Sequence, residues 1–125
     1  MAHTLNNKVQ INGRTVLVEW SKAAARELAQ RTQPMVVELE LYFSCLVKKF
    51  VHFHETMPQC ETVSVSDKLT VFFRSVTSTA CSFDVADRLG RQPEIEINTP
   101  NARKIAPSRV SLDFVRGNWK GEFWI

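Results

Sequence analysis

Hydrophobic and polar positions alternate strictly near the start of the chain, as they do in β-strands that cover a core on one side. Residues 8–11 and 14–20 flank Asn12-Gly13, a dipeptide that tolerates the positive φ angles of a two-residue hairpin turn. Such a turn pairs Ile11 with Arg14. The sequence therefore predicts a hairpin with one apolar face, made by Val9, Ile11, Val16, Val18 and Trp20.

Residues 21–33 change to a helical pattern. Ser21 is placed to act as N-cap, because its hydroxyl can accept a hydrogen bond from an otherwise unpaired amide of the first turn. Pro34 makes continuation of a helix costly, so the helix is expected to end near Thr32. Its narrow apolar face would consist of Ala25, Leu28 and Ala29.

Alternation returns over residues 35–54, where apolar side chains interleave with Glu38, Glu40 and Tyr42. The same stretch could also present a helical face, but its β-branched and aromatic residues favour strand. Strands usually span about 3–10 residues. We therefore expect a bend or a reversal of the chain between Ser44 and Lys49.

Shorter elements follow. Residues 62–65 and 69–76 are expected to pair around Ser66-Asp67, residues 82–89 to form a short helix that ends at Gly90, and residues 94–97 to form a strand. Residues 99–108 look irregular. The chain closes with a second hairpin around Gly117-Asn118, whose predicted register aligns Val110 with Ile125, Leu112 with Phe123 and Phe114 with Gly121.

These elements amount to a single small α+β domain over residues 1–125. We predict a mostly antiparallel sheet built from hairpins, with one or two short helices packed on one face. The composition agrees, because 125 residues with 44% hydrophobic and 23% charged side chains are typical of one globular domain.

The expected compartment is the cytoplasm. No segment supplies the roughly 18 uncharged apolar residues of a membrane helix, and the first residues do not resemble a secretory signal. Cys45, Cys60 and Cys81 are odd in number and widely spaced, which is typical of reduced thiols. We therefore predict no membrane association.

The strongest candidate for chemistry is His52-Phe53-His54. On a strand, both histidines project to one face about 6.5–7 Å apart, close enough to bind one metal ion, with Cys60 (or Glu55) as a third ligand. The alternative is an ordinary strand, in which the histidines face solvent while Val51 and Phe53 pack inward. The spacing matches no established zinc motif.

Two pairs of carboxylates suggest acid and base chemistry, although each pair could also belong to an ordinary polar strand face. Glu38 and Glu40, like Glu94 and Glu96, would each lie on one strand face, where two such strands could hold an acid and a base. The simpler interpretation is a polar face balanced by Lys or Arg from neighbouring strands. Cys60 is the cysteine in the most exposed context, so it is the candidate for a reactive thiol.

The basic charge lies near the end of the chain. Residues 103–125 contain five basic side chains against two acidic ones and account for the net charge of +3. An exposed tryptophan beside cations is typical of a binding surface, either for a protein partner or for single-stranded nucleic acid. We assign this surface to Trp124, Arg116, Lys120, Arg103 and Lys104.

Together, these features favour a binding or assembly module over a catalyst, because no catalytic set has a recognisable spacing. A homodimer or another protein partner is the expected contact of the Trp124 surface. One alternative is a metal-binding protein or metal-dependent enzyme that uses His52 and His54 with Cys60. The other is weak nucleic-acid binding through the C-terminal hairpin, which is the less favoured because no recognition motif accompanies the charge.

Overall fold

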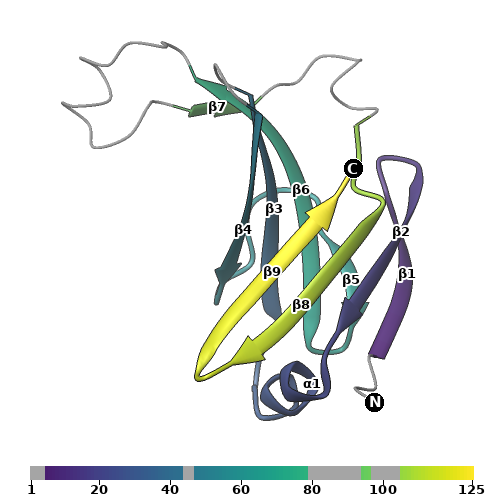
Figure 1. The fold of residues 1–125 in the computed structure, drawn as a ribbon, viewed down its shortest axis with the longest axis vertical. Helices are drawn as coiled ribbons and strands as arrows, with labels where there is room; N and C mark the ends of the chain where they lie inside the picture. The colour runs from purple at the N-terminus through teal and green to yellow at the C-terminus, as the bar shows by residue number, and fades with distance from the viewer. Residues whose placement is uncertain (1–4, 44–46, 79–93, 97–104) are drawn as a thin grey trace, which may run out of the picture.

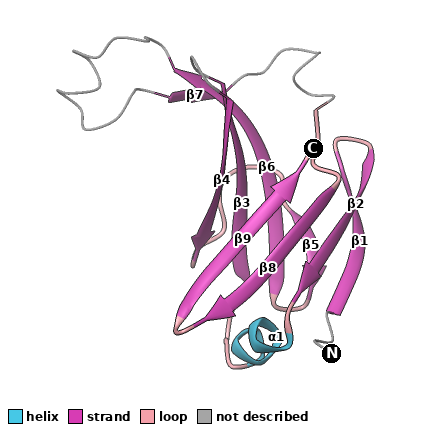
Figure 2. Cartoon of the chain, in the orientation of Figure 1, coloured by secondary structure: helices cyan, strands magenta, loops and turns pink. Residues whose placement is uncertain are grey.

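The computed structural model describes residues 5–43, 47–78, 94–96 and 105–125, and these are mostly β-strand (Figures 1 and 2). Sheet A has the order β1-β2-β8-β9, and sheet B has the order β4-β3-β6-β5, with β7 paired to β6. The strands are β1 (Leu5–Ile11), β2 (Arg14–Trp20), β3 (Met35–Phe43), β4 (Val47–His54), β5 (Val63–Ser66), β6 (Leu69–Ser78), β7 (Glu94–Glu96), β8 (Arg109–Val115) and β9 (Asn118–Trp124).

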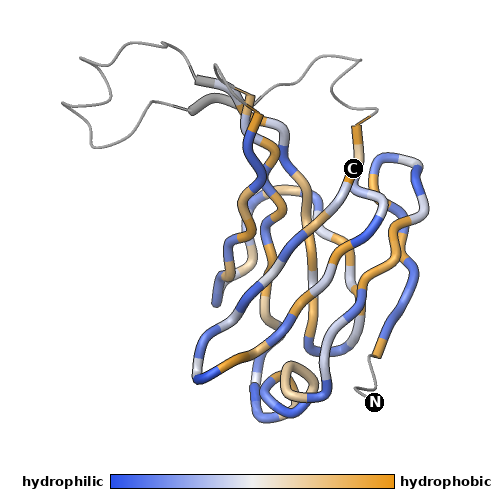
Figure 3. The backbone as a smooth tube through the Cα atoms, in the orientation of Figure 1, coloured by the Kyte–Doolittle hydropathy of each residue, from blue (hydrophilic) through white to orange (hydrophobic). Residues whose placement is uncertain are grey.

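The two sheets pack face to face around one core. Alternating hydrophobic and polar residues along the strands, visible as orange and blue segments in Figure 3, place one apolar face of each sheet toward the other. Phe73 of sheet B lies edge-on to Phe123 of sheet A, with ring centroids 6.1 Å apart. Phe53 and Trp119 stack across the same interface at 5.8 Å.

Both sheets are mixed, so the prediction of a mostly antiparallel sheet was right only for part of the pairings. The hairpins β1–β2 and β8–β9 are antiparallel as predicted, but β2 pairs parallel with β8 and β3 pairs parallel with β6. Parallel neighbours cannot be joined by a tight turn. Sequence alternation and turn residues, which are local signals, therefore did not reveal these two pairings.

The described helix, α1 (Lys22–Ala29), lies at one end of the sheets rather than over a face (Figure 1). The Ser21 hydroxyl accepts a hydrogen bond from the Ala24 amide at 3.1 Å, which confirms the predicted N-cap. The helix ends three residues before Thr32. Its buried residues are Ala24 and Leu28, and Ala25 packs against the core, whereas Ala29 is exposed. The predicted apolar face therefore missed Ala24 and wrongly included Ala29.

The first hairpin has the predicted register, with Ile11 opposite Arg14. The second hairpin differs, because Arg116 and Gly117 adopt the positive φ angles (53° and 80°) of its two-residue turn. Val110 therefore pairs with Phe123 and not with Ile125. This shift of two residues leaves each side chain on the predicted face, since strand faces alternate with a period of two.

The long run at residues 35–54 reverses as expected. β3 and β4 pair antiparallel from Phe43 opposite Val47 to Val36 opposite His54. The predicted pairing of residues 62–65 with 69–76 is confirmed by β5 and β6, and β7 confirms a strand within residues 94–97. The predicted helix at residues 82–89 lies outside the described residues. In the described part of the chain, no helix is both long and apolar enough to span a bilayer.

One connection crosses the outer face of sheet B. β4 and β5 run in the same direction at opposite edges of this sheet, because β4 is antiparallel to β3, β5 is antiparallel to β6, and β3 and β6 are parallel. The chain must therefore return along the sheet between them. In Figure 1, residues 55–62 pass behind β6, on the side away from sheet A. We refer to residues 55–62 as the crossover segment.

Candidate metal centre and neighbouring pocket

The outer face of sheet B buries two carboxylates. Val37, Leu39 and Leu41 of β3 point into the core, so Glu38 and Glu40 point the other way. Even so, Glu38 is only 7% exposed and Glu40 only 4%. β3 is flanked on both sides by β4 and β6, whose side chains surround the two acids. A buried carboxylate needs a charged or hydrogen-bonding partner, because loss of hydration otherwise disfavours the charged form.

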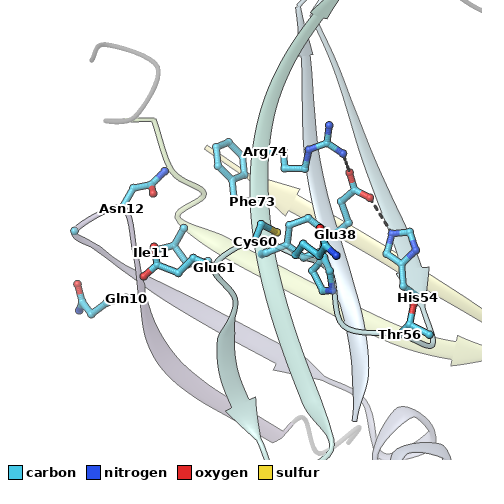
Figure 4. Close-up of a pocket in the computed structure, with 14 residues that line it drawn as sticks. Gln10, Ile11, Asn12, Glu38, His54, Thr56, Cys60, Glu61, Phe73 and Arg74 are labelled. Carbon is cyan, nitrogen blue, oxygen red and sulfur yellow. Dashed lines mark hydrogen bonds and ion pairs between the residues drawn. The ribbon is translucent and has the colours of Figure 1, made fainter. Parts of the chain in front are cut away.

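Strands β4 and β6 supply those partners. His52 Nε2 lies 2.7 Å from Glu40 Oε2, and His54 Nε2 lies 2.8 Å from Glu38 Oε1. Each histidine thus reaches a carboxylate two residues away from its directly paired residue, since Glu38 pairs with His52 and Val36 with His54. From the other side, Arg74 Nη1 donates to Glu38 Oε2 at 2.8 Å. Figure 4 shows Glu38 between Arg74 and His54.

Glu38, Glu40 and His52 form a set of three metal-ligating groups. One ligand atom of each lies within 4.8 Å of the others. Ligands around a tetrahedral zinc ion lie about 3.4 Å apart, because each metal–ligand bond is about 2.0–2.2 Å long. Side-chain rotations could close the difference. His52 is 44% exposed, so an ion could reach this buried acidic pair from solvent.

A pocket of about 860 Å³ lies beside this cluster, between the outer face of sheet B and the crossover segment (Figure 4). Outward-facing side chains of sheet B form one wall, where the His54 and Phe72 rings stack at 6.4 Å. The tip of the β1–β2 hairpin also contributes. The lining residues include Glu38, His54, Phe72 and Arg74 from sheet B, and Gln59, Cys60 and Glu61 from the crossover segment.

An ion pair anchors the start of the crossover segment. Arg31, just after α1, pairs with the Glu55 carboxylate through both terminal guanidinium nitrogens. The hydrogen bond and the charge of Arg31 lower the pKa of Glu55 below its usual value of 4.5. The Glu55 side chain is 80% exposed, so solvent screens much of this interaction.

The structure separates the predicted metal ligands into two groups. His52 and His54 share a face, with ring centroids 6.4 Å apart, and Val51 and Phe53 pack against the core as the alternative interpretation required. Cys60 is exposed and lines the pocket with His54. Neither Cys60 nor His54 is part of the three-residue cluster found among the described residues, which consists of Glu38, Glu40 and His52.

The sequence shows both carboxylates and both histidines, and their pairing depends on where the chain reverses within residues 35–54. A reversal centred on Cys45 would place Glu38 opposite His52 in an antiparallel pair, as observed. Arg74 gave no comparable signal, since it reaches Glu38 through the parallel β3–β6 pairing. The pairing of Arg74 with Glu38 agrees with the prediction of a polar strand face balanced by basic side chains from neighbouring strands, although Glu38 and Glu40 are buried rather than solvated.

The second predicted pair, Glu94 and Glu96, lies on β7, and its side chains are outside the described part of the structure.

Of the predicted basic surface, the described residues are only partly brought together. Trp124 is 37% exposed and has the Arg109 guanidinium 4.9 Å from its ring centroid. Lys120 lies on the same face of β9, but Arg116 occupies the β8–β9 turn at the other end of the hairpin. Six strand residues separate this turn from Trp124, a distance of about 20 Å. Arg103 and Lys104 lie outside the described residues.

No known protein family, curated protein or solved structure matches this chain. The function must therefore be argued from the side chains themselves. The best-defined chemistry is the cluster of Glu38, Glu40 and His52 at the edge of the pocket.

Proposed function

We propose that the protein is a binding module for a transition-metal ion such as Zn²⁺, with Glu38, Glu40 and His52 as ligands. The observation that carries the proposal is a buried pair of carboxylates that already converges with an imidazole, so that all three ligand atoms lie within 4.8 Å. Carboxylate oxygen and neutral imidazole nitrogen are both suitable zinc donors. Relative to the predicted ligand set, His52 is kept, and Glu38 and Glu40 replace His54 and Cys60.

The charge of the cluster supports a cation. Glu38 and Glu40 bring two buried carboxyl groups together, and the Arg74 guanidinium pairs with Glu38. A divalent cation bound by His52 and the two acids would offset the negative charge of the carboxylates that bind it. The cation would also bind Glu40 Oε2, the carboxylate oxygen that lies within hydrogen-bond distance of His52 Nε2.

His54 and Arg74 would act through Glu38. Both contact the Glu38 carboxylate, so they hold it in the orientation that points toward Glu40 and His52. Partners of this kind commonly change metal affinity by about 10–100-fold when they are removed. Three protein ligands would leave a coordination position for water or for a further ligand.

Zinc titration of the purified protein, followed by calorimetry and native mass spectrometry, tests the proposal. We expect one zinc ion per chain, and at least about a hundredfold loss of affinity in Glu40→Gln and His52→Ala, because each removes a ligand. Glu122→Gln is the matched control, since it removes an exposed carboxylate from sheet A. Circular dichroism and thermal unfolding verify that each variant is folded.

A further variant separates the two ligand sets. Cys60→Ser should retain zinc if the acids are the ligands. Loss of zinc in Cys60→Ser together with its retention in Glu40→Gln would instead support the set His52, His54 and Cys60. A folded wild-type protein that binds no zinc would refute both assignments.

We also propose, as a second role, self-association through the outer end of β9. Two large apolar side chains are adjacent there, with Trp124 37% and Ile125 51% exposed. Aromatic residues beside arginine are enriched in protein interfaces, and Arg109 already contacts the Trp124 ring. A second copy of the chain is the partner that fits this proposal, in a homodimer.

A further inference from the structure

We propose that the pocket beneath the crossover segment binds a small organic carboxylate, with Arg74 as its anion contact and the bound metal ion as the condition for binding. This inference rests on the proposed metal-binding function. It adds a ligand class, an anion-binding residue and a coupling between the two sites. Its first support is position, because Glu38 belongs to the metal cluster and also lines the pocket.

Arg74 has unused capacity for an anion. Its one hydrogen bond within the described residues runs from Nη1 to Glu38, whereas a guanidinium carries five N–H donors in a planar fork. The side chain is 31% exposed and lines the pocket. Planar carboxylates fit this fork through two parallel hydrogen bonds, which makes arginine a selective partner for them.

The metal ion determines whether an anion can enter. Without it, the Glu38 and Glu40 carboxyl groups lie close to Arg74 and disfavour a further anion there. A divalent cation bound to these acids adds two positive charges, so that the same region attracts a carboxylate. Glu61 also lines the pocket, but Figure 4 shows it away from Arg74 and His54.

The other walls indicate what the body of the ligand is like. His54 and Phe72 stack with an interplanar angle of 30°, which provides a flat, largely apolar wall next to Arg74. Amide side chains of Gln10, Asn12 and Gln59 line the pocket as well. A flat apolar group carrying one carboxylate satisfies the rings and Arg74 together. Benzoate is the simplest probe with these properties.

The experiment measures benzoate binding by calorimetry to the full chain, with and without one equivalent of Zn²⁺. Benzamide serves as the uncharged probe of the same shape. Arg74→Gln removes the guanidinium, and Arg109→Gln is the matched control, because Arg109 pairs with Glu19 on the outer face of sheet A. Zinc affinity is measured for every variant, so that loss of metal and loss of the anion contact are read separately.

We expect benzoate to bind the zinc-loaded protein at least about tenfold more tightly than the zinc-free protein and more tightly than benzamide. Arg74→Gln should lose about tenfold or more of the benzoate affinity when wild type and variant are compared at zinc concentrations that saturate the metal site of each, because a charged hydrogen bond is removed. By linkage, benzoate should raise the zinc affinity by the same factor that zinc raises the benzoate affinity.

The outcomes separate the two proposals. If the protein does not bind zinc, the proposed function fails, and the inference fails with it. If zinc binds but benzoate is not distinguished from benzamide, or Arg74→Gln binds benzoate as the wild type does, the carboxylate site is refuted and the metal site stands. Equal benzoate binding with and without zinc would refute the coupling.

Discussion

Gly121 shows how a single small residue permits contact between the two sheets. A Cβ atom added there would lie 2.8 Å from Val51 Cγ1 on β4, 3.0 Å from Leu112 Cδ2 and 3.3 Å from Phe53 Cζ. These neighbours are core side chains, which are packed closely and cannot move freely. The absence of a side chain on this inward-facing position of β9 therefore lets the edge of sheet B approach sheet A.

We predict that Gly121→Ala lowers the free energy of unfolding by about 1–3 kcal/mol, because overpacking forces side chains or backbone to shift. Urea denaturation at constant m-value measures this change. Ser111→Ala on the outward face of β8 is the control and should change stability by less than about 0.5 kcal/mol. Equal free energies of unfolding for Gly121→Ala and wild type would contradict this prediction, because they would mean that Val51, Leu112 and Phe53 can move to accommodate the methyl group without loss of stability.

At the scale of elements, the ion pair of Arg31 and Glu55 connects the end of α1 to the start of the crossover segment. The pKa of Glu55 is lower in the folded protein than in the unfolded chain. A lowered carboxyl pKa contributes stability that is present above the unfolded value of 4.5 and is lost as the pH falls through the folded value. Acid should therefore loosen this attachment.

We predict that Glu55→Gln is less stable than the wild type at neutral pH, and that this difference disappears in acid, once Glu55 is protonated. Chemical denaturation of both proteins over a pH series measures it. Glu122→Gln provides the comparison for a carboxylate in sheet A. A difference between Glu55→Gln and wild type that persists unchanged in acid would contradict an ionic origin.

Local signals predicted the elements well and their non-local pairings poorly. Asn12-Gly13 specifies both a turn and a register, so the first hairpin followed from its sequence. In the second hairpin, Arg116 takes a φ angle that arginine rarely adopts, and the predicted turn was therefore misplaced. Glu38 and His52 could be singled out separately. Their partner Arg74 depends on a parallel pairing that no local pattern encodes.

At the scale of the whole molecule, the proposed self-association concerns the exposed residues at the outer end of β9. We predict that the wild type sediments as a dimer and that Trp124→Ala shifts it toward monomer, because truncation of an aromatic interface residue often costs about 2 kcal/mol or more. Sedimentation velocity over a range of concentrations measures the shift. Val115→Ala, on the same face near the other end of the hairpin, is the control. A monomeric wild type would contradict the proposal.

The parallel pairing of β2 with β8 has a further consequence for how the chain folds. Val18 pairs with Val110, so sheet A joins two hairpins that are separated by all of sheet B. Each hairpin can form on its own in about 1–10 μs. Pairing of β2 with β8 brings the two hairpins together and closes a loop that contains most of the chain. Closing this loop costs conformational entropy before the contacts between the hairpins can compensate for it. Folding of this molecule should therefore take milliseconds to seconds, with the meeting of its two terminal hairpins as the slow event.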